Sequence, residues 1–198
     1  MTRYVAGGRS VTLGPELARG GEAIVYRVAG DDAVLAKVYL AAHPGDADKL
    51  RHMRATPPAD PTASLGHPSI AWPTELLFGP HDRFAGYLMP FIRDAVPAVN
   101  VFNPRLRRAT LLPEFGPAYL HRTGRNLASA LSALHARGYV VGDLNERNVL
   151  VTPRALVTLI DADSFQVQQA ADGRIVVFPC PVGRAEYTPP ELQGQAFR

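Results

Sequence analysis

Short apolar runs with strand-like character occupy the N-terminal part of the chain. Residues 11–17, 23–28 and 33–39 are rich in β-branched and aromatic side chains, which favour pleated strands. Gly20-Gly21 separates the first two runs, and Gly30-Asp31-Asp32 separates the second from the third. Because glycine and aspartate are typical turn residues, the pattern predicts three antiparallel strands joined by two turns.

Helical and strand-like segments alternate after this point. Residues 46–55 predict a short helix with two aspartates in its first turn, where the helix dipole favours acidic side chains. Residues 56–68 are rich in proline and predict a loop. Two further apolar runs, 70–78 and 84–92, predict two more strands. Residues 1–92 are therefore predicted to form a five-stranded sheet with one helix.

Helical periodicity replaces the strand pattern further along the chain. Residues 117–137 carry leucine and alanine at intervals of three and four residues, which predicts a helix with one buried face that stops at Gly138. Residues 148–151 and 156–160 predict two short strands. Residues 166–178 predict a hairpin that turns at Asp172-Gly173.

The order of these elements predicts an α+β protein with two lobes. The first lobe, residues 1–92, is antiparallel and β-rich, and the second, residues 93–198, is led by a helix. The connection between them is expected near residues 90–99. The 198 residues suffice for two small lobes, and 46% hydrophobic with 20% charged residues is a composition typical of folded globular proteins.

The positive charge of the chain is modest and dispersed. The formal net charge is +3, and the densest basic run is Arg105, Arg107 and Arg108. A nucleic-acid-binding surface needs a denser footprint, so we expect no nucleic-acid partner and interpret this cluster as a solvated helix face. The single cysteine, Cys180, excludes an intrachain disulfide and is interpreted as structural. The sequence shows neither an apolar stretch of membrane-spanning length nor a signal peptide, so we expect a cytoplasmic protein without a membrane partner.

The chemically informative stretch lies between residues 138 and 165. Asp143 lies in the loop after the predicted helix, Asn148 follows five residues later, and Asp161 ends an apolar strand thirteen residues beyond Asn148. Phosphoryl transfer uses such a set, because one carboxylate orients the attacking hydroxyl while an amide and a second carboxylate hold metal ions on the phosphates.

These residues resemble the motifs of the protein-kinase superfamily, in the family's order, from about residue 13 to residue 191. Residues 143–148 (DLNERN) resemble the catalytic loop D-L-x-x-x-N, and Asp161-Ala162-Asp163 stands where the family has Asp-Phe-Gly. Residues 182–191 (VGRAEYTPPE) resemble the end of an activation segment. Upstream, residues 17–26 (LARGGEAIVY) resemble a glycine-rich loop, and Ala36-Lys37-Val38 resembles the strand that presents the phosphate-binding lysine.

The resemblance implies a role for each group. Asp143 would be the catalytic base, with Asn145 beside it in the catalytic loop, and Asn148 and Asp161 would bind Mg²⁺ or Mn²⁺. Lys37 would bind the α- and β-phosphates of ATP. The other residues implied to contact the nucleotide are Gly20, Gly21, Glu22 and Ala23 over the phosphates, Val25 and Ala36, and Met89, Pro90, Phe91 and Ile92 around the adenine.

The chain departs from the family pattern around the phosphates. The outer glycines of the phosphate loop are Ala18 and Ala23, whose methyl groups restrict how closely the backbone approaches a phosphate. Val141-Gly142 replaces the His-Arg before the catalytic aspartate, so activation by a phosphate on the activation segment is not expected. Asn145 stands where the family has a lysine.

Two further features set the chain apart from the family. The predicted helix 46–55 has no glutamate to pair with Lys37; Asp48 and Glu75 are alternative partners, although each is expected to be solvated instead. The chain also stops at Arg198, shortly after the predicted activation segment. We therefore expect a fragment of a longer protein, with an incomplete helical lobe.

Three functions remain open from the sequence. The favoured one is an atypical bacterial Ser/Thr protein kinase that binds ATP or ADP and phosphorylates a protein substrate. The second is a pseudokinase that binds nucleotide without turnover. The third is a small-molecule kinase of the aminoglycoside or choline kinase type. Gly142-Asp143-Leu144 together with Asn148 also resembles the catalytic loop of those kinases. The sequence does not indicate an oligomeric state.

Overall fold

The computed structural model describes residues 3–110, 115–171, 174–180 and 183–192. The chain divides into two compact units. The first unit contains the residues up to Pro57 together with Trp72–Phe91, and the second contains Pro58–Ala71 and the described residues from Ile92 onward. Residues 58–71 belong to the second unit because they bond to one of its strands: Ala71 N–H donates to the carbonyl of Leu159 (2.8 Å), and Leu159 N–H donates to Ser69 (2.9 Å).

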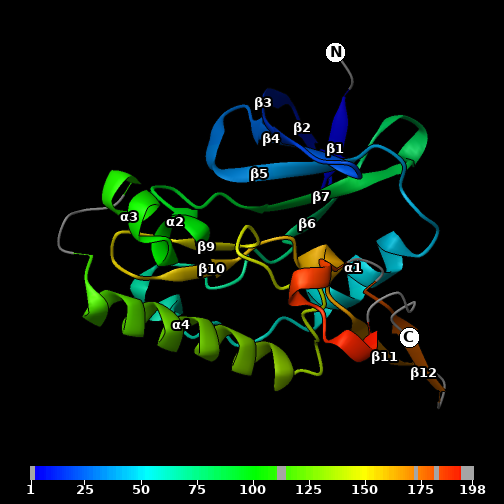
Figure 1. The fold of residues 1–198 in the computed structure, drawn as a ribbon. Coiled ribbons are helices and arrows are strands. Elements are labelled where there is room, and N and C mark those ends of the chain that lie inside the picture. The colour runs from blue at the N-terminus through cyan, green and yellow to red at the C-terminus, as the bar shows by residue number, and fades with distance from the viewer. Residues whose placement is uncertain (1–2, 111–114, 172–173, 181–182, 193–198) are drawn as a thin grey trace. The chain divides into compact units, whose positions relative to one another are not determined.

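The first unit is built on an antiparallel sheet in the order β2-β1-β6-β7-β5-β4-β3 (Figure 1). The strands are β1 (Tyr4–Ala6), β2 (Arg9–Val11), β3 (Leu13–Arg19), β4 (Ala23–Val28), β5 (Asp31–Tyr39), β6 (Glu75–Phe78) and β7 (Phe84–Pro90). The sheet has seven strands where the sequence predicted five, because the N-terminal residues add the hairpin β1–β2 across Gly7 and Gly8, both of which have positive φ.

Two of the predicted strands differ in extent from the observed ones. The run predicted over residues 11–17 is divided between β2 and β3 at residue 12. The run predicted over residues 70–78 forms strand only from Glu75, and Ile70 makes an isolated bridge to Leu159 instead. Pro73 lies inside this run, and proline cannot donate to a strand ladder.

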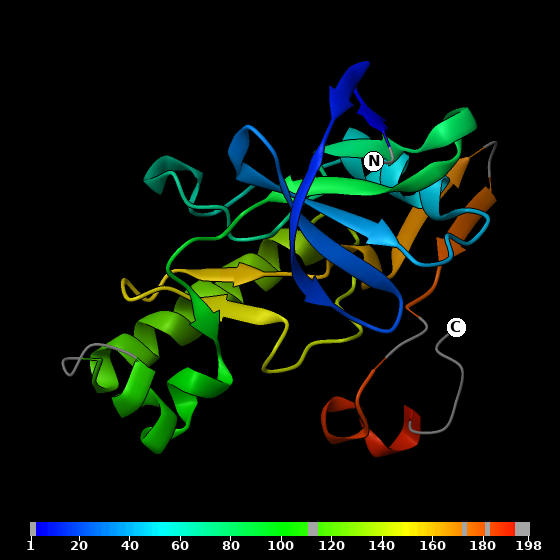
Figure 2. The same cartoon turned by 90° about the horizontal axis from the view of Figure 1, so that it is seen from above.

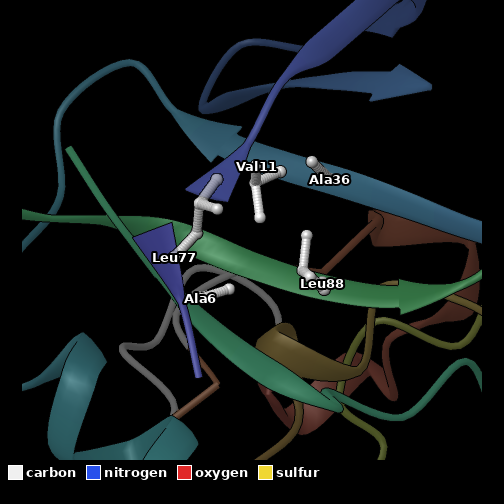
Figure 3. Close-up of a cluster of buried hydrophobic side chains, with 5 residues drawn as sticks. All are labelled: Ala6, Val11, Ala36, Leu77 and Leu88. Carbon is white, nitrogen blue, oxygen red and sulfur yellow. The ribbon is translucent and has the colours of Figure 1, made fainter. Parts of the chain in front are cut away.

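The core of the first unit lies on one face of this sheet. Five buried side chains from five strands form its centre: Ala6, Val11, Ala36, Leu77 and Leu88. Figure 3 shows these side chains gathered between the N-terminal hairpin and the strands β5, β6 and β7. Since successive side chains of a strand point to opposite faces, the neighbours of these residues in β5 and β7 face the other side of the sheet.

The predicted helix α1 (Asp46–Ala55) is confirmed, and its C-terminal end is tied to the segment leading into β6. Trp72 Nε1 donates to the carbonyl of Met53 (3.1 Å), and Arg54 Nε donates to the carbonyl of Thr74 (2.7 Å). Arg54 also forms an ion pair with Glu75 (3.0 Å). Helix α1 is therefore held through its last turn.

The second unit contains three α-helices among its described residues: α2 (Val99–Phe102), α3 (Pro104–Thr110) and α4 (Pro117–His135). Helix α4 confirms the predicted helix, ending two residues earlier than expected, and Gly138 beyond it has φ of 77°. The short helix α2 was not predicted, because it is too short to display helical periodicity. Helix α3 carries Arg105, Arg107 and Arg108, the cluster that the sequence predicted to be a solvated helix face. The described helices include none that is long and apolar enough to cross a membrane.

Short strands and turns complete the second unit. Strand β9 (Val149–Val151) lies between β10 (Val157–Leu159) and β8 (Val96–Pro97), and Asn126 of α4 donates to the carbonyl of Ala155 beside this sheet (2.8 Å). The predicted C-terminal hairpin is confirmed as β11 (Val167–Ala171) and β12 (Arg174–Phe178), seen from above in Figure 2, although its predicted turn Asp172-Gly173 lies outside the described residues. The chain also makes five 3₁₀ turns in its described parts: η1 (Ala63–Leu65), η2 (Pro80–Asp82), η3 (Ala162–Ser164), η4 (Ala185–Tyr187) and η5 (Pro190–Leu192).

Candidate active site

The loop before β9 holds the predicted catalytic aspartate between two amides. Asn148 Nδ2 donates to Asp143 Oδ2 (2.9 Å), and Asn145 Nδ2 donates to Asp143 Oδ1 (3.1 Å). Both amides also donate to the carbonyl oxygen of Asp143, at 3.0 and 3.2 Å. The carboxylate is therefore fixed in orientation, while each of its oxygens keeps a second lone pair for another donor.

Asn145 is the structural centre of this loop. Its side chain is buried at 3% exposure, and its Oδ1 accepts the backbone N–H groups of Arg147 (2.9 Å) and Asn148 (3.3 Å). The sequence placed Asn145 among the catalytic groups, but a side chain this buried and fully engaged in the loop orients Asp143 and has no surface to offer a substrate. We therefore assign it as a positioning residue.

The two predicted metal ligands are brought together by one backbone hydrogen bond. Ile160 N–H donates to the carbonyl of Asn148 (3.0 Å), so Asp161 emerges next to Asn148 at the end of β10. Asp161 has φ of 64° and ψ of 39°, a left-handed conformation that costs a non-glycine residue roughly 1–2 kcal/mol. Such strain persists only where the surrounding structure holds it, and it is concentrated at functional sites.

The chemistry of these donors suits a hard divalent cation. Because the Nδ2 of Asn148 is directed to Asp143, its Oδ1 is the atom that a cation would meet. Asn148 and Asp161 would thus contribute one amide oxygen and one carboxylate, and Mg²⁺ is usually held by one or two protein carboxylates while phosphate oxygens and waters complete its shell. Within the described residues there is no cluster of three or more His, Cys, Asp or Glu side chains that would form a complete protein cage.

In the first unit, Lys37 lies on the face of the sheet opposite the core cluster. It pairs with Val25 of β4 and Tyr87 of β7, and its side chain is 9% exposed. The ammonium Nζ lies 6.0 Å from the ring centre of Tyr39 and 5.9 Å from that of Tyr87. These distances are at the limit of a cation–π interaction, which helps to hold the charged end of Lys37 in a largely apolar setting.

Ala36 does not share this face. It is fully buried in the core cluster on the other side of the sheet, so its predicted contact with the nucleotide is corrected. On this strand, Leu35 lies on the same face as Lys37 and pairs directly with Met89, and the side chains of Leu35 and Met89 are buried. The two-residue period of a strand carried this information, because residues 35 and 37 must face the same way.

The glycine turn between β3 and β4 is exposed and open. Gly20 N–H donates to the carbonyl of Ala23 (2.9 Å), closing the turn over Gly21 and Glu22. A Cβ on Gly20 would meet only the Ala23 carbonyl at an ordinary 3.7 Å, and a Cβ on Gly21 would meet nothing within 4 Å. The fold itself does not require glycine at either position, which is consistent with space kept for a ligand.

The predicted adenine-contacting segment, residues 89–92, begins with the last two residues of β7. Its first residue, Met89, is buried, while Pro90, Phe91 and Ile92 are half-buried. Phe91 N–H is bonded to the carbonyl of Ala33 (2.8 Å), and the guanidinium of Arg27 stacks over the Phe91 ring at 3.8 Å from its centre. No local sequence pattern indicates this contact of Arg27.

The two acids considered as partners of Lys37 both form ion pairs with arginines. Asp48 pairs with Arg51 one turn along α1, and Glu75 pairs with Arg54 at 3.0 Å. The expectation that Glu75 is solvated is therefore corrected, since its side chain is only 30% exposed and helps to tie α1 to β6.

Cys180 packs directly against the residue that precedes the catalytic aspartate. It is 2% exposed, which confirms its structural interpretation. A Cβ built on Gly142 would lie 2.4 Å from Cys180 Sγ and 2.6 Å from its Cβ, so the cysteine occupies the space that any other side chain at position 142 would need.

Comparison with known proteins supports a kinase fold. No family model matches the chain. Two curated relatives, both named Protein kinase YegI, are 37% identical over 194 residues in Escherichia coli O157:H7 and 35% identical over 192 residues in strain K12. The alignments cover 97% and 96% of this chain, but the chain spans only 28% of the length of each relative.

Solved structures resemble the whole chain in fold. The ROP18 kinase domain, solved in complex with AMP-PNP and sucrose, matches with a TM-score of 0.60 at 18% identity, covering 100% of this chain and 62% of that one. ROP2 from Toxoplasma gondii, described as having a protein-kinase fold and no enzymatic activity, matches with a TM-score of 0.58 at 16% identity and the same coverage. Its β-rich first unit and these solved structures give the chain a protein-kinase-like fold, and its sequence is similar to proteins named as protein kinases.

Proposed function

We propose that this chain is the ATP-binding and catalytic region of an atypical Ser/Thr protein kinase. The observation that carries the proposal is the pair of hydrogen bonds around Asn148, whose amide nitrogen orients Asp143 and whose carbonyl receives the N–H preceding Asp161. One residue thus sets the position of the group that would meet the substrate hydroxyl and of the group that would meet the metal.

The roles follow from the chemistry of each side chain. Asp143 would accept the proton of the attacking hydroxyl, because its carboxylate is oriented by two amides and keeps acceptor capacity. Asn148 and Asp161 would hold Mg²⁺, which supplies charge neutralisation on the phosphates. Lys37 would bind the phosphates of ATP, and the open turn at Gly20 and Gly21 would cover them.

A pseudokinase is the second candidate, and one observation favours it. Where the family carries a lysine near the transferred phosphate, this chain has Asn145, and its side chain is buried within the loop. A cation is therefore absent from this position of the loop, which weakens stabilisation of charge in the transition state without preventing nucleotide binding.

Calorimetric titration with ATP, in the presence and absence of Mg²⁺, tests the proposal. We expect Mg²⁺-dependent binding that weakens by about tenfold or more in Asp161→Asn, which corresponds to about 1.4 kcal/mol. Asp94→Asn is the matched control, because Asp94 is an exposed aspartate that also has positive φ and asparagine tolerates this conformation.

The outcomes separate the two candidates. Mg²⁺-dependent binding together with transfer of the γ-phosphate to serine or threonine of an acceptor protein such as casein supports the kinase. Binding without transfer identifies a pseudokinase. Equal affinities for the Asp161→Asn and Asp94→Asn variants would reject the assigned metal ligands.

A further inference from the structure

Glu146 joins the catalytic loop to the segment that follows Cys180. It lies three residues after Asp143, and its side chain is only 16% exposed. Its Oε1 lies 3.6 Å from Arg184 Nη1, and its carboxylate accepts a hydrogen bond from the hydroxyl of Tyr187. Glu146 therefore receives one cation and one neutral donor from a single turn of the chain.

The turn η4 explains why Arg184 and Tyr187 reach the same carboxylate. Tyr187 N–H donates to the carbonyl of Arg184 (2.9 Å), and the Thr188 hydroxyl donates to the same oxygen (2.8 Å). In a 3₁₀ turn, side chains three residues apart eclipse one another. Arg184 and Tyr187 consequently project to the same side, where both contact Glu146 of the catalytic loop.

The hydrogen bond to Glu146 raises the pKa of Tyr187, so the Tyr187 hydroxyl keeps the proton that it donates. The other carboxylate oxygen of Glu146, Oε2, is buried and has no hydrogen-bond partner within the described part of the chain. Compensation for the burial of this carboxylate therefore comes from Tyr187, Arg184 and the neighbouring Arg147, whose Nε lies 3.9 Å from Oε1.

A second contact supports the same junction from the other end of the loop. Cys180 fills the space beside Gly142, directly before Asp143. The loop that carries Asp143 is thus fixed to the following segment on both sides of the aspartate, by packing at Gly142 and by charge at Glu146.

We propose that Glu146 is a positioning residue that holds residues 183–188 against the catalytic loop without any phosphate on that segment. The chain has glycine at position 142, where an arginine would be needed to receive such a phosphate. The Glu146 carboxylate supplies a negative charge from the chain itself, and the side chains of Arg184 and Tyr187 contact it. Any effect of this contact on the binding of a protein substrate rests on the proposed function. The contact between Glu146 and residues 183–188 itself does not.

Hydrogen exchange, measured by mass spectrometry on this chain, tests the junction independently of catalysis. The reporters are the amides of Tyr187 and Thr188, which are bonded to the carbonyls of Arg184 and Ala185. We expect Glu146→Gln to accelerate their exchange by about tenfold, the effect of losing one charge-assisted interaction. Glu186→Gln is the matched control, since Glu186 is an exposed glutamate on the same turn, and it should leave the exchange rate unchanged.

A double-mutant comparison identifies the partner. If the Tyr187 hydroxyl acts through Glu146, then Tyr187→Phe should accelerate exchange on its own but add little in the Glu146→Gln background. Equal exchange in the Glu146→Gln and Glu186→Gln variants, or fully additive effects of the Glu146→Gln and Tyr187→Phe substitutions, would overturn the proposal.

Parallel titration with ATP and Mg²⁺ separates this inference from the proposed function. Accelerated exchange in a chain that binds no ATP would keep the junction and reject the kinase. Where phosphate transfer is measurable, Glu146→Gln should raise the KM for the protein acceptor while leaving the affinity for ATP within about twofold, a pattern expected when uniform binding of one substrate is lost. A loss of ATP affinity equal to that of Asp161→Asn would instead place Glu146 in the nucleotide site and reject its positioning role.

Discussion

Replacing Gly142 with alanine should disturb the loop that carries the catalytic aspartate. The new Cβ would lie 2.4 Å from Cys180 Sγ and 2.6 Å from Cys180 Cβ, far closer than carbon and sulfur atoms approach without covalent bonding. Cys180 is 2% exposed, so its side chain has no solvent space into which it can move. We therefore expect Gly142→Ala to destabilise the second unit by about 2–3 kcal/mol, the upper part of the range for overpacking a buried site.

Substitutions of Cys180 should relieve this clash in two steps. Cys180→Ala removes Sγ but leaves the Cβ contact, so combined with Gly142→Ala it should recover only part of the lost stability. Cys180→Gly removes both atoms, and the pair Gly142→Ala with Cys180→Gly should then be more stable than the sum of the two single changes by at least about 1 kcal/mol, a coupling typical of residues in contact.

Urea unfolding followed by circular dichroism at 222 nm is the suitable assay, because the long helix α4 belongs to the second unit. The three single variants and the two pairs are compared with the unchanged chain. Additive free energies in the pair that contains Cys180→Gly would refute the reasoning, since they would show that positions 142 and 180 do not share one space.

Four further substitutions test other parts of the fold by urea titration. A Cβ on Gly86, whose φ is 155°, would lie 1.9 Å from a carbonyl oxygen of β5, so Gly86→Ala should lower the free energy of unfolding by about 3 kcal/mol or more. A Cβ on Gly124 in α4 would meet nothing within 4 Å, so Gly124→Ala should raise the free energy of unfolding by about 1 kcal/mol. Similar results for the two variants would contradict the reasoning. Burial lowers the pKa of His67, so the folded state binds a proton on this imidazole less readily than the unfolded state does. The free energy of unfolding should therefore be constant above about pH 6.5 and fall below it. His67→Gln should flatten this pH dependence, and an unchanged pH dependence would assign it to another group. Glu75→Gln should cost about 0.5–1 kcal/mol through the partly exposed pair with Arg54, and no change would show that the backbone contacts of α1 suffice.

The elements that the sequence predicted well are those whose signal is local. Helix α4 follows from the spacing of its leucines, and the strands β4 and β5 follow from β-branched residues bounded by glycine and aspartate. The errors arise where the structure of a segment depends on a pairing partner that is distant in the sequence. Residues 70–71 continue an apolar run, yet their backbone bonds to Leu159, nearly ninety residues further along the chain in the same unit, a pairing that no local pattern encodes.

The candidate site was predictable in its residue types and less so in their roles. The spacing of Asp143, Asn148 and Asp161 was sufficient to predict a common site in the second unit. The role of Asn145 was not, because burial depends on how the loop closes, and its Oδ1 accepts two backbone N–H groups that the sequence does not reveal. Ala36 shows the reverse case: the alternation of side chains along a strand already placed it on the face opposite Lys37.

Three residues in and beside the catalytic loop make internal contacts. Glycine at position 142 leaves the space that Cys180 fills, asparagine at 145 orients Asp143 from within the loop, and glutamate at 146 contacts Arg184 and Tyr187. At positions 142 and 145 the chain lacks the arginine and the lysine of the family pattern, and each replacement is matched by an internal contact. Two amides hold the carboxylate of Asp143 in one orientation. A loop built in this way can present its aspartate to a substrate hydroxyl, which is the physical argument for testing turnover as well as binding.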